Sequence, residues 1–590
     1  MRFGLRPTLL VIAAAMMVLS FSIVASAGAS SSAPPKPGPA GKPSKPEKPA
    51  KLVQLQLLSF NDYHGTLEPP AGTDATLGAA LDPSNTLVGG AAFLATELNE
   101  LRAPVKESNS LTVAAGDLIG GSPFLSGLFH DEPSVETLEA MGLDVSSVGN
   151  HEFDEGITEL KRMQDGGCHP VDGCYFPSDP YDGATFKWLA ANVTYTATGE
   201  TVLPPTWTKT IGGVKVGFIG MTLEGTPELV AASGIQGLSF NDEVETANAA
   251  AAKLQEHDVE AIVVLLHEGG AQAGQYNGCT GISGPIVAIA ENLAPSIDLV
   301  ITGHTHQPYV CTINDPAGNP RQVTSASSFG RVVTETWLTL DKETHDVVRS
   351  ATTSTNHLVV RTTPDPTLTG IIDKWKIASA PIANRVVGSI TADITNPGNR
   401  QQETAMQNLV ADGILAATKP AANGGAQMAF INPGGVRAEL IFNQLSGGEQ
   451  PGEIIYGEAF AVQPFGNLLV TMDMTGAKIK AALEQQFFPR PPRARLVLGI
   501  SEGITYDWLQ SAAQGSNVAN LELNGIPIDP LATYRVALPQ FLADGGDLFT
   551  EFRSGTNRKG AGDDLAAFVG YLGATSPVSP PSTNRVNELP

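Results

Sequence analysis

The hexapeptide Gly149-Asn150-His151-Glu152-Phe153-Asp154 directly follows the short segment Val145–Val148, which predicts a β-strand. Its amide, imidazole and carboxylate side chains are of the types that bind metal ions and transfer protons. Six consecutive residues of this kind are hard to reach by chance. Because ligands of open α/β sheets bind beyond the carboxyl ends of the strands, the hexapeptide indicates an α/β fold with a functional site at that edge.

Four more polar clusters follow predicted strands in the same half of the chain. These strands are expected at Val53–Phe60, Leu111–Ala115, Ala261–Leu266 and Leu299–Thr302. The polar residues after them are, in order, Asp62 and His64, then Asp117, then His267, then His304 and His306. In each of the two pairs the members are two positions apart, so an extended backbone directs both side chains to one side. Imidazole and carboxylate together suit Zn, Mn, Fe or Co, and a carboxylate such as that of Asp117 can bridge two cations about 3.5–4 Å apart.

The order of the five clusters resembles that of the calcineurin-like metallophosphoesterases, and the hexapeptide is similar to the form found in the 5′-nucleotidase branch. The resemblance implies a catalytic dyad of His151 and Asp154. It also implies two metal sites, one with Asp62, His64, Asp117 and His306 and the other with Asp117, Asn150, His267 and His304. One position departs from the pattern, because the best-known nucleotidases carry an amide where this chain has His306. The preferred metal is therefore left open.

The second half of the chain predicts another α/β domain. Strands are expected at Met428–Ile431, Leu468–Met474 and Tyr534–Leu538, and helices at Glu403–Thr418 and from a Thr475 cap to about Phe487. The resulting organisation is a metallophosphoesterase α/β sandwich at 52–363, a partly helical linker at 364–384, an α/β substrate-binding domain at 385–575 and a disordered tail at 576–590.

Two aromatic residues in separate turns of this second domain, Phe465 and Phe541, are candidates for stacking on both faces of a flat base. Each stacking face contributes about 1–3 kcal/mol in nucleic-acid binders. The alternative is that each ring belongs to the core, as a lone Phe in such a turn commonly does. Resemblance to the 5′-nucleotidase C-terminal domain implies base stacking by Phe465 and Phe541, ribose binding by Asp547, and binding of the phosphate or positioning of the substrate by Arg400, Asn432 and Arg437.

The N-terminus predicts export. Residues 1–27 combine two arginines, an apolar run over Leu9–Val24 and the small residues Ala25-Ser26-Ala27, as a signal peptide does. An uncleaved membrane anchor is the alternative, although the run is short for a spanning helix. Residues 28–51 are rich in Ser, Pro, Gly and Lys and predict an extended tether, whose lysines either are solvated or contact an anionic wall or membrane surface. We expect a secreted or wall-associated protein without stable membrane insertion.

The four cysteines fit an exported protein. An even number predicts two disulfides, and the pairs closest in sequence are Cys168–Cys174 and Cys279–Cys311. A zinc site is the alternative, but these spacings match no usual zinc pattern.

The chain has 590 residues and a net charge of −24. Binding to a nucleic-acid polymer is disfavoured, because it requires basic surface. The sequence instead predicts a nucleotide substrate, hydrolysed at the 5′-monophosphate by a secreted phosphomonoesterase with two divalent metal ions. The alternatives are a 2′,3′-cyclic nucleotide phosphodiesterase or UDP-sugar pyrophosphatase of the same family, and a non-catalytic surface protein. The sequence does not indicate the oligomeric state.

Overall fold

The computed structural model describes residues 51–589 except 231–233, 398–400 and 490–493. The predicted signal peptide, nearly all of the tether and Arg400 lie outside the described residues. Among the described residues, no helix is long and apolar enough to cross a membrane.

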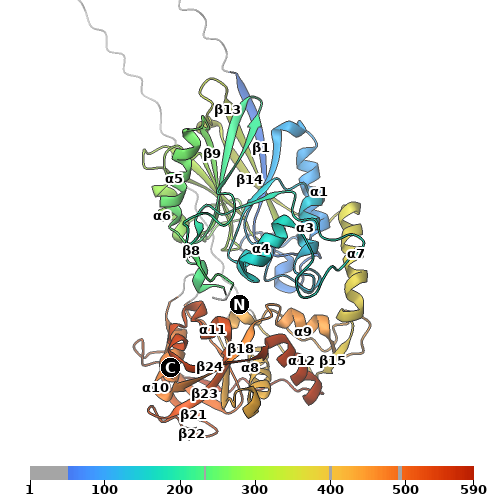
Figure 1. Ribbon diagram of the computed structural model, residues 1–590, viewed down its shortest axis with the longest axis vertical. Helices are drawn as coiled ribbons and strands as arrows, with labels where there is room; N and C mark the ends of the chain where they lie inside the picture. Colours follow the sequence, from blue (N-terminus) through green and yellow to red (C-terminus); the bar gives the residue numbers. More distant parts are fainter. Residues whose placement is uncertain (1–50, 231–233, 398–400, 490–493, 590) are drawn as a thin grey trace, which may run out of the picture. The chain divides into compact units, whose positions relative to one another are not determined.

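Two six-stranded mixed sheets form the first half of the described chain (Figure 1). The first contains, in spatial order, β14 (Thr353–Leu358), β13 (Val332–Asp341), β1 (Leu52–Phe60), β2 (Ser110–Ala115), β3 (Val145–Ser147) and β4 (Lys187–Leu189). The second contains β11 (Pro308–Asn314), β12 (Pro320–Ala326), β10 (Leu299–Thr302), β9 (Ala261–His267), β7 (Val214–Thr222) and β6 (Thr206–Ile211). One buried apolar cluster draws on both sheets, including Leu57 and Val113 from the first and Val263 and Leu265 from the second. The sheets therefore pack face to face.

Helices cover the outer faces of both sheets. The first sheet shares its outer core with α1 (Ala91–Arg102), α3 (Glu132–Ala140) and α4 (Gly156–Asp165), and the short α2 (Phe124–Gly127) lies before α3. The second sheet shares its outer core with α5 (Glu243–Gln255) and α6 (Pro285–Asn292). Helix α5 begins where the Asp242 side chain accepts a hydrogen bond from the backbone N–H of Glu245 at 2.7 Å. A separate pair of strands, β5 (Val193–Tyr195) and β8 (Leu238–Phe240), completes this α/β sandwich.

An 18-residue helix, α7 (Pro366–Ala383), occupies the segment expected to be a partly helical linker. It begins at Asp365, whose side chain accepts from the backbone N–H groups of the second and third helical residues. Buried Leu368 and Trp375 pack into the core of the first half, and the Trp375 indole donates to Glu136 at 2.7 Å. The helix is thus anchored by apolar contacts over its first half.

The second half is built on a five-stranded sheet of β19 (Gly499–Ile500), β16 (Met428–Ile431), β23 (Thr533–Pro539), β18 (Leu468–Thr475) and β24 (Thr556–Asp563). One apolar layer includes α8 (Ala405–Thr418), α9 (Tyr456–Val462) and α12 (Asp564–Thr575). The other includes α10 (Gly476–Glu484), α11 (Gln540–Ala543), β20 (Ile504–Leu509) and β21 (Val518–Leu523). Two smaller sheets pair β15 (Val386–Ser389) with β17 (Glu453–Ile455), and β22 (Ile526–Pro527), β21 and β20 with β25 (Val586–Leu589). The predicted two-domain α/β architecture is confirmed.

The chain end differs from its prediction. We expected disorder over 576–590, but Val586–Leu589 forms β25, which pairs in parallel with β20. Just before it, Arg585 pairs with Asp412 on α8 at 2.7 Å. The Ser- and Pro-rich composition describes only the start of this segment. Composition cannot show that β20 has an open edge with which the last residues pair. The prediction of a disordered end was wrong for that reason.

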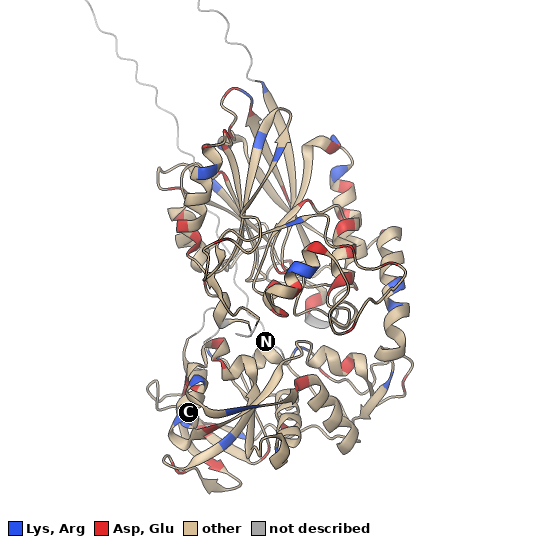
Figure 2. Cartoon of the chain, in the orientation of Figure 1, with Lys and Arg blue, Asp and Glu red and all other residues tan. Residues whose placement is uncertain are grey.

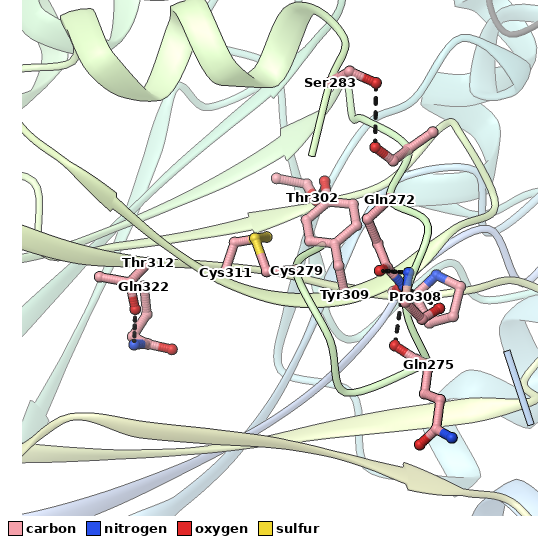
Figure 3. The surroundings of a disulfide bond; sticks show 12 residues. Gln272, Gln275, Cys279, Ser283, Thr302, Pro308, Tyr309, Cys311, Thr312 and Gln322 are labelled. Atoms are coloured by element: carbon pink, nitrogen blue, oxygen red, sulfur yellow. Dashed lines mark hydrogen bonds between the residues drawn. A yellow bond between two sulfur atoms is a disulfide. The ribbon is translucent and has the colours of Figure 1, made fainter. Parts of the chain in front are cut away.

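Both expected disulfides, Cys168–Cys174 and Cys279–Cys311, are present. Figure 3 shows the second, which ties β11 to the loop that precedes α6. Near it, the Gln272 amide donates to the backbone carbonyl of Gln275 at 3.0 Å, which helps to hold the same loop (Figure 3).

Candidate active site

Parallel strand pairing brings the five polar clusters to one edge of the sandwich. In the first sheet β1 is parallel to β2, and β2 to β3, so the residues that follow these strands emerge at the same end. In the second sheet β9 is parallel to β10. The predicted residues lie at or just beyond these carboxyl ends, namely Asp62 and His64 after β1, Asp117 after β2, Asn150 after β3, His267 at the end of β9, and His304 and His306 after β10.

Asp62, His64 and His306 form the first group that could hold a metal ion. The Nε2 atom of His306 lies 3.2 Å from Asp62 Oδ1 and 3.3 Å from His64 Nε2. Asp62 and His64 are buried, whereas His306 is partly exposed. The group therefore has a closed inner side and an accessible outer side.

Asp117, His267 and His304 form the second group. The Nε2 atom of His267 lies 2.9 Å from Asp117 Oδ2, and His304 Nδ1 lies 3.1 Å from the side-chain oxygen of Asn150. Asp117 Oδ2 also lies 3.7 Å from His64 Nε2 of the first group. A single carboxylate thus stands between the two groups.

The hydrogen bonds of two imidazoles show that this donor set fits a cation. The Nδ1 atom of His267 is 2.8 Å from the carbonyl oxygen of Ala115, and Nδ1 of His64 is 2.8 Å from that of Gly120. A carbonyl only accepts, so each Nδ1 carries a proton, and each ring in its neutral form presents the Nε2 lone pair to the centre. His267 Nε2 has no hydrogen-bond partner despite its short distance to the Asp117 carboxylate. Two electron-rich atoms facing each other in a buried site require a cation near them.

The charges of the buried groups agree with this arrangement. Burial alone would raise the pKa of Asp117, but the imidazoles of His267, His151 and His64 hold it well below its usual range. Burial lowers the pKa of His64 to about 3, so that ring is neutral. Without a metal ion, burial opposes protonation of His267 but Asp117 dominates and raises its pKa to about 10. When no metal ion is bound, the imidazole of His267 therefore binds a proton beside the Asp117 carboxylate.

Five of the candidate ligands have a left-handed backbone, with φ values of 51° at Asp62, 47° at His64, 51° at Asp117, 69° at His304 and 57° at His306. Such conformations are unfavourable for non-glycine residues and collect at functional sites. The adjoining Gly149 leaves no room for a side chain, because an added Cβ would collide with Asp117. The loops are thus shaped to direct several ligands inward at once.

His151 and Asp154 lie beside the two groups. The Nδ1 atom of His151 is 2.7 Å from Asp154 Oδ2, which also accepts from the backbone N–H of Gly121 at 3.0 Å. Burial disfavours the charged imidazole, but Asp154 and Asp117 outweigh it and raise the pKa of His151 to about 9. The ring centroid of His151 is 5.0 Å from that of His64. A protonated imidazole therefore faces the region of the candidate ligands.

Two residues at this site were missed by sequence reasoning. Glu152 is buried, and its carboxylate accepts from the backbone N–H groups of Asp117, Leu118 and Gly149. Its place within the hexapeptide was a usable signal. Phe329 has a φ of 58° and a ring centroid 5.3 Å from that of His306. It lies in a Ser-rich segment that carries no recognisable signal.

The predicted substrate-binding residues are only partly brought together. The Asn432 amide donates to Asp547 at 2.8 Å, and the Arg437 guanidinium lies 5.6 Å from the centroid of the Phe465 ring. Phe465 stacks at 6.2 Å on His151. Phe541 contacts Gly546, the residue before Asp547, because a Cβ added to Gly546 would meet its ring. Arg400 lies outside the described residues.

Two family models match the chain. Residues 56–308 match the calcineurin-like phosphoesterase model, and residues 386–554 match the 5′-nucleotidase C-terminal domain. The first of these families implies divalent metal ions, in agreement with the ligand groups found here.

Curated relatives and a solved structure are similar to this chain over most of its length. A cell wall protein of Listeria monocytogenes serovar 1/2a is 33% identical over 88% of this chain and 67% of its own length. The endonuclease YhcR of Bacillus subtilis is 32% identical over 88% of this chain, which spans only 40% of that protein. The crystal structure of a 5′-nucleotidase precursor from Thermus thermophilus has a TM-score of 0.70 at 26% identity, covering 91% of this chain and 99% of that one. The chain therefore belongs to the 5′-nucleotidase family, with a calcineurin-like phosphoesterase domain followed by a 5′-nucleotidase C-terminal domain, and is a hydrolase of phosphoesters.

Proposed function

We propose that this protein acts outside the cytoplasm and hydrolyses nucleoside 5′-monophosphates to nucleoside and phosphate, using two divalent metal ions. The observation that carries the proposal is the position of Asp117 between two ligand groups, 3.7 Å from His64 in one and 2.9 Å from His267 in the other. One bridging carboxylate between two sets of imidazoles is the arrangement of two-metal hydrolases.

The proposed ligands follow the two groups. One ion would be held by Asp62, His64, Asp117 and His306, and the other by Asp117, Asn150, His267 and His304. When bound, the ions would activate a water molecule and neutralise charge on the phosphoryl oxygens. The Nδ1–H groups of His64 and His267 donate to backbone carbonyls, which fixes both rings with Nε2 directed at the ion.

His151 is the proposed acid. Asp154 Oδ2 accepts a hydrogen bond of 2.7 Å from His151 Nδ1. This carboxylate keeps the ring protonated, so Nε2 has a proton to donate. From this position the imidazolium stabilises negative charge on a phosphoryl oxygen, or it protonates the nucleoside 5′-oxygen as that oxygen leaves. The backbone N–H of Gly121 fixes Asp154 in turn.

We assign nucleotide recognition to the C-terminal domain. Phe465 and Phe541 would stack on the base, and Asp547 would accept from the ribose hydroxyls while Asn432 orients its carboxylate at 2.8 Å. Arg437 would bind the phosphate, since a guanidinium can donate two parallel hydrogen bonds to it. The same role for Arg400 rests on the sequence alone.

Export is proposed on three observations. The sequence begins with a signal-peptide pattern, both cysteine pairs form disulfides, and a relative is named a cell wall protein. Disulfides persist in oxidising compartments outside the cytoplasm.

Phosphodiesters and the pyrophosphates of nucleotide sugars are the alternative substrates. The endonuclease name of one relative favours testing them, and 2′,3′-cyclic nucleotides and UDP-sugars are the small candidates. To test this, the protein is stripped of metal with a chelator and then refilled separately with Zn, Mn, Mg or Ca. Activity is measured as phosphate release, or by chromatography of the nucleoside and nucleotide products. AMP and UMP should be hydrolysed fastest, ahead of UDP-glucose, 2′,3′-cyclic AMP and p-nitrophenyl phosphate. Faster turnover of a diester or of the simple phosphate would overturn the proposed specificity, and activity that survives metal removal would overturn the metal assignment.

A further inference from the structure

A single peptide unit links a candidate metal ligand to the proposed dyad. It joins Gly120 to Gly121 in the loop that follows β2. Its carbonyl oxygen, on Gly120, accepts a hydrogen bond of 2.8 Å from Nδ1 of His64. Its N–H, on Gly121, donates at 3.0 Å to Oδ2 of Asp154, the oxygen that also lies 2.7 Å from His151 Nδ1. The orientation of this one peptide therefore sets the positions of His64 and of the dyad together.

The close approach of this peptide to His151 requires glycine. Gly120 and Gly121 have left-handed φ values of 80° and 56°. A Cβ added to Gly120 would collide with the backbone carbonyl oxygen of His151, and one added to Gly121 would lie 3.3 Å from the His151 ring. Because glycine has the freest backbone of all residues, the peptide depends on hydrogen bonds from other elements to keep its orientation.

Asp131 supplies such a hydrogen bond from the start of α3. Its side chain is buried, Oδ2 accepts from the backbone N–H of Gly120 at 2.8 Å, and Oδ1 accepts from the Ser126 hydroxyl at 2.6 Å. An aspartate directly before a helix commonly accepts from the first backbone N–H groups of that helix. Asp131 makes no such capping bond. Its carboxylate is therefore directed to the glycine loop and not to its own helix.

The setting of Asp131 distinguishes it from the other acidic residues nearby. Acidic residues are frequent on α3 and on α4 (Figure 2), so negative charge alone is no sign of a role. Asp131 differs because it is buried and has a left-handed backbone with φ of 60°, which is uncommon outside glycine. From the same helix, the Ser134 hydroxyl donates at 2.9 Å to the backbone carbonyl of Leu118, two residues before Gly120. The start of α3 thus supports the loop at two points.

We propose that Asp131 is a positioning residue of the active site, which orients His64 and Asp154 through the Gly120–Gly121 peptide. The proposal rests on the proposed function, in which His64 is a metal ligand and Asp154 belongs to the dyad. Removal of the carboxylate leaves the Gly120 N–H without its acceptor in a buried place, so the loop shifts and both side chains lose their alignment. The loss of a supporting partner of this kind costs about 10–100-fold in metal affinity or activity.

Three variants separate positioning from general stability. Asp131→Gly removes the acceptor without backbone strain, since glycine adopts a left-handed φ freely. Asp131→Asn is the conservative variant, because its amide oxygen can accept from Gly120 while its NH₂ group donates to the Ser126 hydroxyl. Asp258→Gly is the matched control, because Asp258 is exposed and has a similar φ of 58°. Thermal unfolding of each variant is recorded first, so that loss of folded protein is not counted as loss of alignment.

The measurements are amide exchange, metal affinity and steady-state kinetics of the full chain. Hydrogen exchange of the Gly120 and Gly121 amides is followed by fragmentation mass spectrometry in metal-stripped protein, and Zn²⁺ affinity by competition with a chelator. Asp131→Gly should exchange both amides faster and bind Zn²⁺ about 10–100-fold more weakly. At metal saturation its kcat on AMP should fall by a similar factor with KM little changed, since nucleotide recognition is assigned to the C-terminal domain. Asp131→Asn and Asp258→Gly should stay close to the wild type.

A folded Asp131→Gly with wild-type amide exchange and Zn²⁺ affinity would overturn the proposal. Equal losses in Asp131→Asn and Asp131→Gly would also overturn it, because charge and not the accepted hydrogen bond would then be the cause. If Asp131→Gly does not fold, the stripped wild type decides, since slow exchange of both amides is expected and fast exchange would contradict the hydrogen bonds. A wild type that binds Zn²⁺ but does not hydrolyse AMP would refute the proposed function alone, and the exchange and affinity comparisons would still test Asp131.

Discussion

The buried carboxylate of Glu152 accepts a hydrogen bond of 2.9 Å from the backbone N–H of Asp117, the residue that stands between the two ligand groups. The same carboxylate accepts from the N–H of Leu118 at 2.8 Å and from that of Gly149. Glu152 therefore joins the loop after β2 to the loop after β3. It holds Asp117 in place through the backbone.

Glu152→Gln should weaken metal binding and lower the melting temperature. Glutamine has one accepting oxygen, so its NH₂ group would face backbone N–H donors, and each donor left unpaired in a buried place costs about 1–3 kcal/mol. The measurements are metal affinity by competition with a chelator and thermal unfolding of the stripped protein. The exposed Glu256→Gln is the control. A Glu152→Gln variant with unchanged metal affinity would remove Glu152 from the positioning of Asp117.

His151→Ala should retain bound metal and lose most of its turnover. The imidazole is not needed as a ligand in the proposed site, whereas general acid catalysis contributes about 10²–10⁴-fold to a rate. Metal content and kcat on AMP are measured on the same preparation, with His257→Ala as a control at an exposed histidine. Full activity would exclude the dyad, and loss of metal would show that His151 is a ligand.

Replacing both Phe465 and Phe541 by alanine should reduce kcat/KM on AMP far more than on p-nitrophenyl phosphate. Loss of two stacking faces at about 1–3 kcal/mol each predicts a decrease of at least about 30-fold that is specific to substrates with a base. Phe465 also stacks on His151, so its replacement alone tests whether that contact affects both substrates. Equal losses on the two substrates would contradict the base sandwich and assign the rings to the support of the catalytic site.

Much of the fold could be read from local patterns. The predicted strands Leu299–Thr302 and Met428–Ile431 begin and end where expected, because each is a short apolar run that the sheets bury. Thr475 caps α10 as predicted and accepts from the backbone N–H of Lys478. β25 was missed because its pairing with β20 is a tertiary contact between residues about 80 positions apart.

The site was predictable to the extent that its chemistry is carried by residue type. Asp62, Asp117 and His267 stand out as polar groups after apolar strands, and parallel pairing then brings them together. Phe329 was not predictable, since an aromatic ring becomes relevant there only through a left-handed backbone that turns it onto His306.

Asp564, at the start of α12, should make the stability of the protein depend on pH. Burial is the main cause that raises the pKa of Asp564 to about 7, and the negative charge of Asp563 also raises it. The hydrogen bond of 3.0 Å that the Asn467 amide donates to this carboxylate lowers the pKa and only partly offsets the rise. A carboxyl group whose pKa is higher in the folded state binds its proton more tightly there, so its contribution to stability is fully present below pH about 4. That contribution is lost as pH rises through about 7. Asp564→Asn keeps the uncharged shape, so relative to the wild type it should gain stability between pH 4 and 8.

Urea unfolding at several pH values measures the difference, with the exposed Asp373→Asn as the control. If the difference between Asp564→Asn and the wild type does not change over this range, Asp564 is already ionised in the folded protein at acidic pH and its hydrogen bonds outweigh its burial.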